Sequence, residues 1–202
     1  MTALEAALAH VRHIYLVSVA IGFAIAGLGL IRVRARTGEQ PLTLLSRPEP
    51  RELLRAGAVL GHVALYVLAT FRPDIWLFAP FLTPRPVTIV AGATLLYGGL
   101  ALYLTCVVTL GRSFRIGGDP GGSSVLVTRG VYARVRHPIY TAMFVESVGA
   151  TIMLPCALTL AALPIAALGL HAQAVREERW WLEHHGEEYG RYVDRTGRFI
   201  PR

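Results

Sequence analysis

The sequence contains no lysine, few charged residues and only two cysteines. All twenty of its basic residues are arginine, which is typical of GC-rich genomes and favours a bacterial source. Charged residues make up 16% of the chain, whereas a soluble domain normally has about a quarter. Cys106 and Cys156 stand far apart in apolar stretches, so they predict neither a disulfide framework nor a metal site. These absences argue against a soluble domain, a disulfide-stabilised domain and a metal centre.

Long apolar stretches stand where a soluble protein would carry charge. The chain has 202 residues, of which 53% are hydrophobic. Charged residues are missing from four stretches, namely 13–31, 56–71, 86–111 and 147–175. A helix needs roughly 20 apolar residues to span a bilayer. The sequence therefore predicts an all-α integral membrane protein.

We expect about five transmembrane helices in a single membrane domain, 1–202. They are predicted at about 13–31, 53–71, 86–110, 137 or 138 to 154, and 156–171. Pro155 separates the last two helices, which predicts a tight C-terminal hairpin, and Pro164 should kink the fifth helix. The three-span N-terminal region, residues 1–110, is thereby distinguished from a C-terminal region, residues 111–202.

The segment after the hairpin predicts an amphipathic tail helix. It runs from about 173 to 192, and a break is expected at Gly186. Trp180 and Trp181 suit the headgroup layer of a membrane. Tyr189 and Tyr192 are three residues apart and should share one face of the helix.

The arginines indicate how the chain is oriented. With five spans, seventeen arginines fall on one side of the membrane and three on the other. The three are Arg12, Arg72 and Arg85. Because basic residues favour the cytoplasmic side, the amino terminus should lie outside and the tail in the cytoplasm. The first apolar stretch follows Glu5 and His10 rather than a basic segment, so we expect it to remain as a helix. The net charge of +7 is explained by membrane lipids and orientation, not by nucleic acid.

Two groups of polar residues lie at the ends of the predicted hairpin. Arg136, His137 and Tyr140 surround a proline that can begin a helix. Glu177 and Glu178 follow the last apolar stretch. Because the two hairpin helices are antiparallel neighbours, both groups should meet at the cytoplasmic face. Adjacent residues point about 100° apart on a helix, so we expect at most one glutamate, Glu177, to face inward and Glu178 to be solvated.

Glu146 is an exception among the apolar residues of the fourth span. A carboxylate near the middle of a bilayer costs at least a few kcal/mol, so it should be functional or paired. Two interpretations remain open. Glu146 either contributes to function, or is protonated and hydrogen-bonded to a neighbouring helix, with His62 or Tyr66 as partners.

Several sequence elements together resemble the isoprenylcysteine carboxyl methyltransferase family and, more loosely, the related phospholipid N-methyltransferases. They are Gly111-Arg112-Ser113-Phe114, Leu126-Val127-Thr128-x-Gly130-Val131-Tyr132, Arg136-His137-Pro138-x-Tyr140, Glu177-Glu178, Gly186-Glu187-Glu188-Tyr189-x-x-Tyr192 and Phe199-Ile200-Pro201. The resemblance covers about Gly111 to Pro201. The first hundred residues match only as membrane spans.

The resemblance implies a membrane methyltransferase that uses S-adenosylmethionine, with no metal. The C-terminal region, residues 111–202, would bind this cofactor, and a lipophilic acceptor would enter from the bilayer. The family's cofactor contacts fall here on Val125, Leu126, Val127, Tyr132, His137, Pro138, Ile139, Tyr140 and Glu177. Methyl transfer mainly requires the two reactants to be aligned where water is excluded. We expect Arg136, His137, Tyr140 and Glu177 to carry the catalytic function by holding the reactants in that alignment.

The substrate side departs from the family. Gln173 stands where the eukaryotic enzymes have an arginine that helps to bind substrate, and Arg176 lies three residues further on. Together with Glu146, these residues are the candidate acceptor contacts, and they indicate an oxygen, sulfur or nitrogen nucleophile on an apolar scaffold.

Two other functions remain as alternatives. One is a sterol-reductase-like oxidoreductase that uses NADPH, because such enzymes have a similar Gly-x-x-Tyr-x-x-Tyr tail. The other is a non-enzymatic membrane assembly or carrier protein, in which Glu146 would be a proton or ion site.

Overall fold

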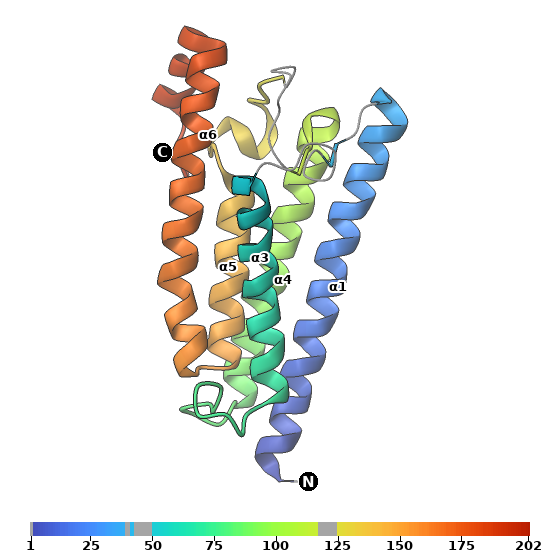
Figure 1. Ribbon diagram of the computed structural model, residues 1–202, viewed down its shortest axis with the longest axis vertical. Coiled ribbons are helices and arrows are strands. Elements are labelled where there is room, and N and C mark those ends of the chain that lie inside the picture. Colours follow the sequence, from blue (N-terminus) through green and yellow to red (C-terminus); the bar gives the residue numbers. More distant parts are fainter. Residues whose placement is uncertain (1, 39–40, 43–49, 117–124) are drawn as a thin grey trace.

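The computed structural model describes residues 2–38, 41–42, 50–116 and 125–202. In these residues it contains five α-helices and two short 3-10 helices, η1 and η2. The α-helices are α1 (Ala3–Thr37), α3 (Pro50–Phe71), α4 (Pro86–Leu110), α5 (Pro138–Met153) and α6 (Ala157–Arg195). They stand side by side and alternate in direction (Figure 1).

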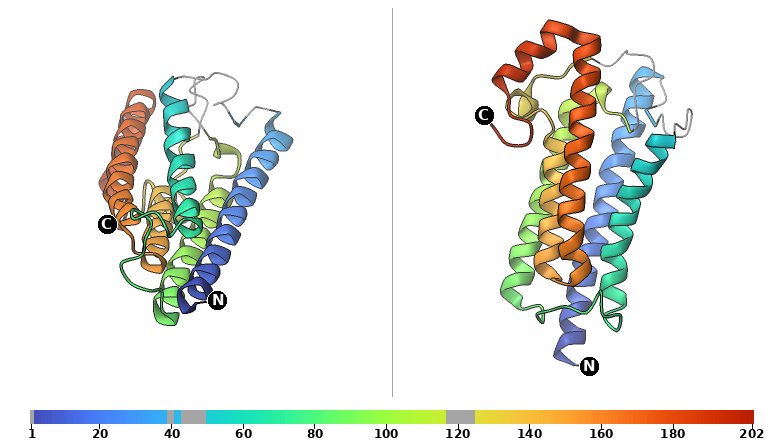
Figure 2. Two further views of the ribbon diagram at one scale, coloured as in Figure 1. Left: turned by 60° about the horizontal axis from the view of Figure 1, so that its bottom comes forward. Right: turned by 60° about the vertical axis from the view of Figure 1, so that its left-hand side comes forward.

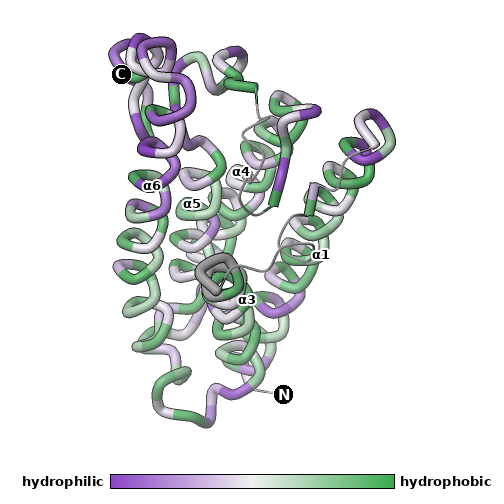
Figure 3. Tube along the Cα trace, turned by 45° about the horizontal axis from the view of Figure 1, so that its top comes forward, coloured by the Kyte–Doolittle hydropathy of each residue, from purple (hydrophilic) through white to green (hydrophobic). Residues whose placement is uncertain are grey.

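Three helices, α1, α6 and the segment from Pro86 to Ser113, are long and apolar enough to cross a membrane. Ala56–Phe71 within α3 is a shorter apolar helix. Figure 3 shows apolar residues along the helices and hydrophilic ones gathered where α6 ends. The charge-free stretch ends before Arg176, so the remaining part of α6 carries the charged residues of this helix.

Local signals explain where the helices begin and end. Thr2 and Glu5 form a capping box at the start of α1, and Gly38 ends that helix in a left-handed conformation. Proline at the first helical position begins both α4 and α5, where a missing N–H costs no hydrogen bond. The hairpin predicted around Pro155 is confirmed, because α5 ends at Met153 and α6 begins at Ala157.

The last helix runs on past the hairpin and then breaks. Residues 157–185 are continuous, so the first part of the predicted tail helix extends the fifth span. The residue with non-helical angles inside α6 is Gly186 (φ 47°, ψ −122°), where two helices join across a kink, and the kink expected at Pro164 stays a prediction. A positive φ is readily adopted by glycine, and after it the chain turns back toward α5 (Figure 2). The break predicted at Gly186 is thereby confirmed.

Glycines hold α4 against α5. A Cβ atom added to Gly92 would lie 2.5 Å from the carbonyl oxygen of Gly149, and one added to Gly99 would lie 2.6 Å from Cγ of Glu146. Without a large hydrophobic driving force between helices in lipid, small residues let backbones approach closely. These contacts place α5, with its polar N-terminal end, firmly within the bundle.

Candidate functional site

The N-terminus of α5 carries the first group of site residues. His137 is the N-cap residue with non-helical angles, and Pro138 is the first helical residue. Tyr140 then lies less than one turn further, and its ring stacks on that of His137 with centroids 5.4 Å apart. Pro138 therefore turns both side chains toward the neighbouring helix α6.

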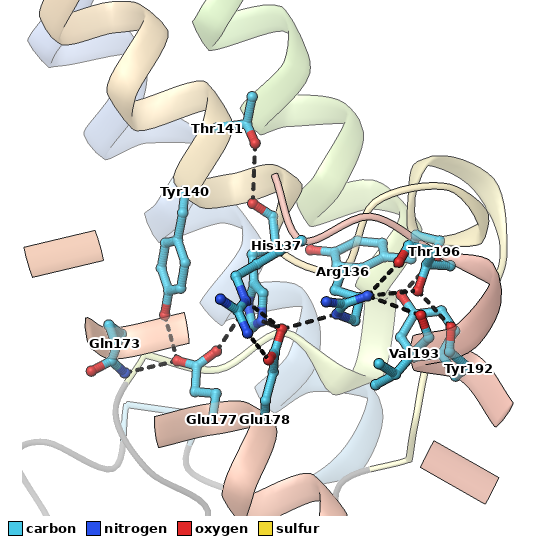
Figure 4. Close-up of polar contacts among 12 residues, drawn as sticks. Arg136, His137, Tyr140, Thr141, Gln173, Glu177, Glu178, Tyr192, Val193 and Thr196 are labelled. Atoms are coloured by element: carbon cyan, nitrogen blue, oxygen red, sulfur yellow. Dashed lines mark hydrogen bonds and ion pairs between the residues drawn. The ribbon is translucent and has the colours of Figure 1, made fainter. Parts of the chain in front are cut away.

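Both glutamates of α6 face His137. Nδ1 of His137 lies 3.5 Å from Oε2 of Glu177, and Nε2 lies 3.3 Å from Oε1 of Glu178. Figure 4 shows the imidazole between the two carboxylates. The expectation that at most one glutamate faces inward is wrong. The side chains of Glu177 and Glu178 diverge on the helix, but the two nitrogens of the His137 ring point in different directions and reach both. The predicted meeting of the two hairpin ends is confirmed.

Glu177 is the more open of the two carboxylates. The hydroxyl of Tyr140 donates to its Oε1, and Nε2 of Gln173 donates to the same oxygen at 2.8 Å. Arg176 in turn donates to Oε1 of Gln173 at 2.9 Å. The Glu177 side chain is 38% exposed, whereas that of Glu178 is 11% exposed. Gln173 and Arg176, predicted on the acceptor side, are thus joined to Glu177.

Glu178 is buried and doubly paired, which corrects the expectation that it is solvated. Its Oε1 accepts from Nε of Arg136 at 2.9 Å, and its Oε2 accepts from Nη2 of Arg198 at 2.7 Å. Only 11% of its side chain is exposed. The reason is that the C-terminal segment folds back over this face, and no periodicity within α6 could reveal that.

The C-terminal segment is attached to the start of α5 by backbone hydrogen bonds. The amide of Arg136 donates to the carbonyl of Gly197 at 2.9 Å, and that of His137 donates to Arg198 at 3.0 Å. The Thr141 hydroxyl donates to the carbonyl of Phe199 at 2.6 Å. The tail therefore covers the polar cluster, which we define as Arg136, His137, Tyr140, Gln173, Glu177, Glu178 and Arg198.

Electrostatics favour the charged forms in this cluster. Burial by itself lowers the pKa of His137, but the hydrogen bonds and charges of Glu177 and Glu178 outweigh it and raise the pKa. Burial works in the opposite sense on Glu177, yet His137, Tyr140 and Gln173 bring its pKa below the usual value. The pKa of Glu178 is also lowered, because His137, Arg198 and Arg136 overcome desolvation.

Tyr132 and Ile139 lie within the protein and not in the polar cluster. Tyr132 is buried in η2 (Gly130–Ala133), and its carbonyl accepts from the hydroxyl of Tyr192 at 2.7 Å. Ile139 packs against an apolar group that includes Val33 and Phe114. Both residues therefore offer apolar surface beside the polar cluster.

The predicted contacts at Val125, Leu126 and Val127 stand apart from this network. Val125 is exposed, and its carbonyl accepts from the hydroxyl of Ser113 at 3.3 Å. No hydrogen bond between described residues joins these three to the polar cluster. They stay predictions.

Glu146 does not have the partners expected for it. Nε2 of His62 lies 2.9 Å from the hydroxyl of Ser147, and the hydroxyl of Tyr66 lies 2.7 Å from that of Thr151. Ser147 and Thr151 lie on a different face of α5 from Glu146. The interpretation that His62 or Tyr66 pairs with Glu146 is therefore wrong.

Sequence reasoning missed Arg198 and Thr196. Thr196 accepts from the guanidinium of Arg136 through its carbonyl, and Arg198 completes the pairing of Glu178. Neither residue belongs to a motif quoted above, and their distance along the chain from Arg136 hides the contact. The one sequence signal for this pairing is the number of arginines in the tail, which could neutralise the carboxylates of Glu177 and Glu178.

The arrangement provides a half-open carboxylate, a phenol and an imidazolium at one end of an apolar bundle. Such a set can bind a ligand that carries ammonium, hydroxyl and carboxylate groups, while Glu178 and the arginines keep the set in place. Among residues 2–38, 41–42, 50–116 and 125–202, no three His, Cys, Asp or Glu side chains are grouped to hold a metal.

Comparisons with known proteins agree on one family. Residues 92–184 match the model described as "Isoprenylcysteine carboxyl methyltransferase (ICMT) family". A protein-S-isoprenylcysteine O-methyltransferase of Xenopus laevis is 28% identical over 171 residues, covering 75% of this chain and 56% of that protein. The enzyme of the same name from Tribolium castaneum is 33% identical over 106 residues, 51% of this chain and 38% of that protein.

Two further comparisons concern a bacterial relative and a solved structure. The nickel-cobalt-cadmium resistance protein NccN of Alcaligenes xylosoxydans is 32% identical over 115 residues, 57% of this chain and 53% of that protein. The solved eukaryotic intramembrane Ras methyltransferase ICMT superposes with a TM-score of 0.63 at 23% identity, covering 95% of this chain and 67% of that one. The chain thus has this all-α integral membrane fold and spans about half the length of the curated relatives.

Proposed function

We propose that the protein is a membrane methyltransferase of the isoprenylcysteine carboxyl methyltransferase family, whose model residues 92–184 match. It transfers a methyl group from S-adenosylmethionine to a lipophilic acceptor with an oxygen, sulfur or nitrogen nucleophile. The observation that carries the proposal is the convergence of Tyr140, His137 and Gln173 on the half-open carboxylate of Glu177.

The residues present fit this cofactor. When bound, S-adenosylmethionine supplies a methyl group on a positively charged sulfur, and this sulfur leaves when the acceptor's lone pair attacks the methyl carbon in line. Glu177 provides the negative charge that an ammonium or sulfonium favours, and Tyr140 and Gln173 fix its orientation. His137, whose pKa is raised by its two carboxylates, faces them with both ring nitrogens and holds Glu177 in place. Binding and alignment of this kind are the main requirements of the reaction.

Arg136 acts as a positioning residue in this proposal. Its guanidinium is 9% exposed and is occupied by Glu178 and by the carbonyls of Val193 and Thr196. It therefore holds the tail over the cofactor site and excludes water from it. Tyr132, Pro138 and Ile139 supply the apolar wall, and we place Val125, Leu126 and Val127 beside the adenine.

We assign the cofactor site to the C-terminal region, residues 111–202, and membrane anchoring to the N-terminal region, residues 1–110. The asymmetry of the arginines supports our proposal that the polar cluster faces the cytoplasm of a bacterial cell, with the amino terminus outside. A cytoplasmic site has access to S-adenosylmethionine, while the acceptor arrives from the bilayer.

Binding of S-adenosylhomocysteine to the detergent-purified protein tests the proposal. We expect micromolar binding by the wild type and a loss of at least about tenfold in both His137→Ala and Glu177→Gln. Thr94→Ala, which removes an exposed hydroxyl bonded to the carbonyl of Val90 in its own helix, serves as the control and should bind normally. Absence of binding by the wild type, together with binding of NADPH, would replace the methyltransferase by the oxidoreductase alternative.

A further inference from the structure

Glu146 is a titratable side chain that the proposed cofactor site does not use. It follows His137 by nine residues on α5, which corresponds to about 13 Å along the helix axis. Its side chain is half-buried. It therefore lies well inside the apolar interior of the bundle, on the same face of α5 as Ile139 two turns nearer the polar end.

The surroundings of Glu146 contain no cation. α4, α5 and the charge-free stretch 13–31 of α1 have no arginine or lysine. No hydrogen bond or ion pair joins the Glu146 carboxyl to another residue in the described ranges of the chain. In an apolar medium, a carboxyl group without a partner costs several kcal/mol. A bound ligand would supply the partner that the described part of the chain does not.

The bundle leaves room for Glu146 and lines it with phenols. Gly99 of α4 lacks the Cβ atom that would lie 2.6 Å from Cγ of Glu146. Tyr15 of α1 and Tyr103 of α4 lie near enough for a charge on the carboxyl group to disfavour ionisation of their phenols. Tyrosine rings contribute an apolar wall and attract cations through their faces. Three helices thus contribute to one partly open polar position in an otherwise apolar wall.

We propose that Glu146, with Tyr15 and Tyr103, binds a hydrogen-bond-donating group, an amine or a hydroxyl, within the apolar portion of the methyl acceptor. This inference rests on the proposed function and names its substrate class. A plain isoprenoid chain has only carbon and hydrogen at that depth, so it would leave the carboxyl group unpaired. The acceptor of this protein is therefore an amphiphile with a second polar group remote from the methylated atom.

A series of S-alkyl cysteines tests the inference. One series has plain chains, and the other has a single hydroxyl or amine moved stepwise along the chain. Their affinities are measured by fluorescence competition and by the thermal shift of the detergent-purified protein, so that no turnover is needed. We expect one position of the donor group to bind at least about tenfold more tightly than the plain chain, because one net hydrogen bond is gained.

Three variants locate the effect. Glu146→Leu should abolish the preference for the donor group. Gly99→Ala should weaken it, because the added Cβ would lie 2.6 Å from Cγ of Glu146 and 2.9 Å from the carbonyl oxygen of Ala142, which displaces the carboxyl group and parts α4 from α5. Glu146→Gln keeps a carbonyl acceptor but no charge. It should therefore retain the preference for a hydroxyl and lose that for an amine, which shows which of these two groups the acceptor carries. Val145→Leu, next to Glu146 on α5, is the control and should behave as the wild type.

Binding of S-adenosylhomocysteine is measured in every variant and separates the two proposals. If the wild type does not bind it, the proposed function fails, while the chain series still tests the acceptor subsite. If the wild type has no preference for any donor position, or if Glu146→Leu keeps that preference, the inference on Glu146 is overturned whatever the cofactor data show.

Discussion

The two carboxylate regions of the hairpin differ in how their charge is compensated. At the polar end, Glu178 has Arg136 and Arg198 at hydrogen-bonding distance. In the middle of α5, Glu146 lies against Gly99 and has no counterion in the charge-free helices around it. The first region is stabilised by charge within the protein, whereas the second is packed against a neighbouring helix without a charged partner. In our proposals, the polar end binds the cofactor and Glu146 selects the acceptor.

The largest effect is expected for Glu178→Ala. Removing one partner of a buried ion pair leaves Arg136 uncompensated, which typically costs about 3 kcal/mol. Thermal unfolding in detergent and limited proteolysis of residues 196–202 measure the loss of stability and the release of the tail. Glu177→Ala is the matched control, because that side chain is 38% exposed. An equal loss of stability in both variants would contradict the distinction between the adjacent glutamates.

A smaller effect is expected from the packing of the bundle. Gly149→Ala places a methyl group 2.5 Å from the carbonyl oxygen of Gly92, and overpacking of this kind costs about 2 kcal/mol. The loss should be independent of pH and salt, which thermal unfolding over a series of buffers can verify. Gly98→Ala, where an added Cβ meets nothing within 4 Å, provides the control.

The polar end should make the stability of the protein depend on pH. The pKa of His137 is raised, so its contribution is complete below the unfolded value of about 6.5 and is lost as pH rises through the folded value. The pKa of Glu178 is lowered, so its contribution is complete above about 4.5 and is lost at more acidic pH. We expect maximal stability between these values. His137→Gln should remove the loss of stability at pH values above the pKa of His137. Unfolding temperatures measured over a range of pH will reveal this change.

The smallest effect is expected for the exposed ion pair between Arg191 and Glu187, whose nitrogen and oxygen lie 3.6 Å apart. Arg191→Ala should change neither the unfolding temperature nor the binding of S-adenosylhomocysteine, since solvent screens such a pair. A clear destabilisation would mean that the compact arrangement of the tail depends on surface charge as well as on Glu178.

The sequence predicted more of the fold than of the contacts within the site. Pro155 located the hairpin because proline fixes φ and cannot donate a helical hydrogen bond. Gly186 located the break in α6 because glycine readily adopts a positive φ. The meeting of His137 with Glu177 followed from the antiparallel hairpin. The burial of Glu178 did not follow, because it depends on Gly197 and Arg198 pairing with the backbone of α5. The expected partners of Glu146 failed for a related reason: the rotation of α3 about its axis, not its hydropathy, directs His62 to Ser147.

The sequence by itself determined an apolar, helical chain with one polar end, since lengths of apolar stretches and the positions of prolines are local properties. The tertiary structure decided which charges are neutralised by the protein and which are left for a ligand. That decision depends on the close approach of α4 to α5 through their glycines and on the return of the tail over Glu178. Both are contacts between residues distant along the chain, and their free energies depend on distances that no pattern of residues specifies.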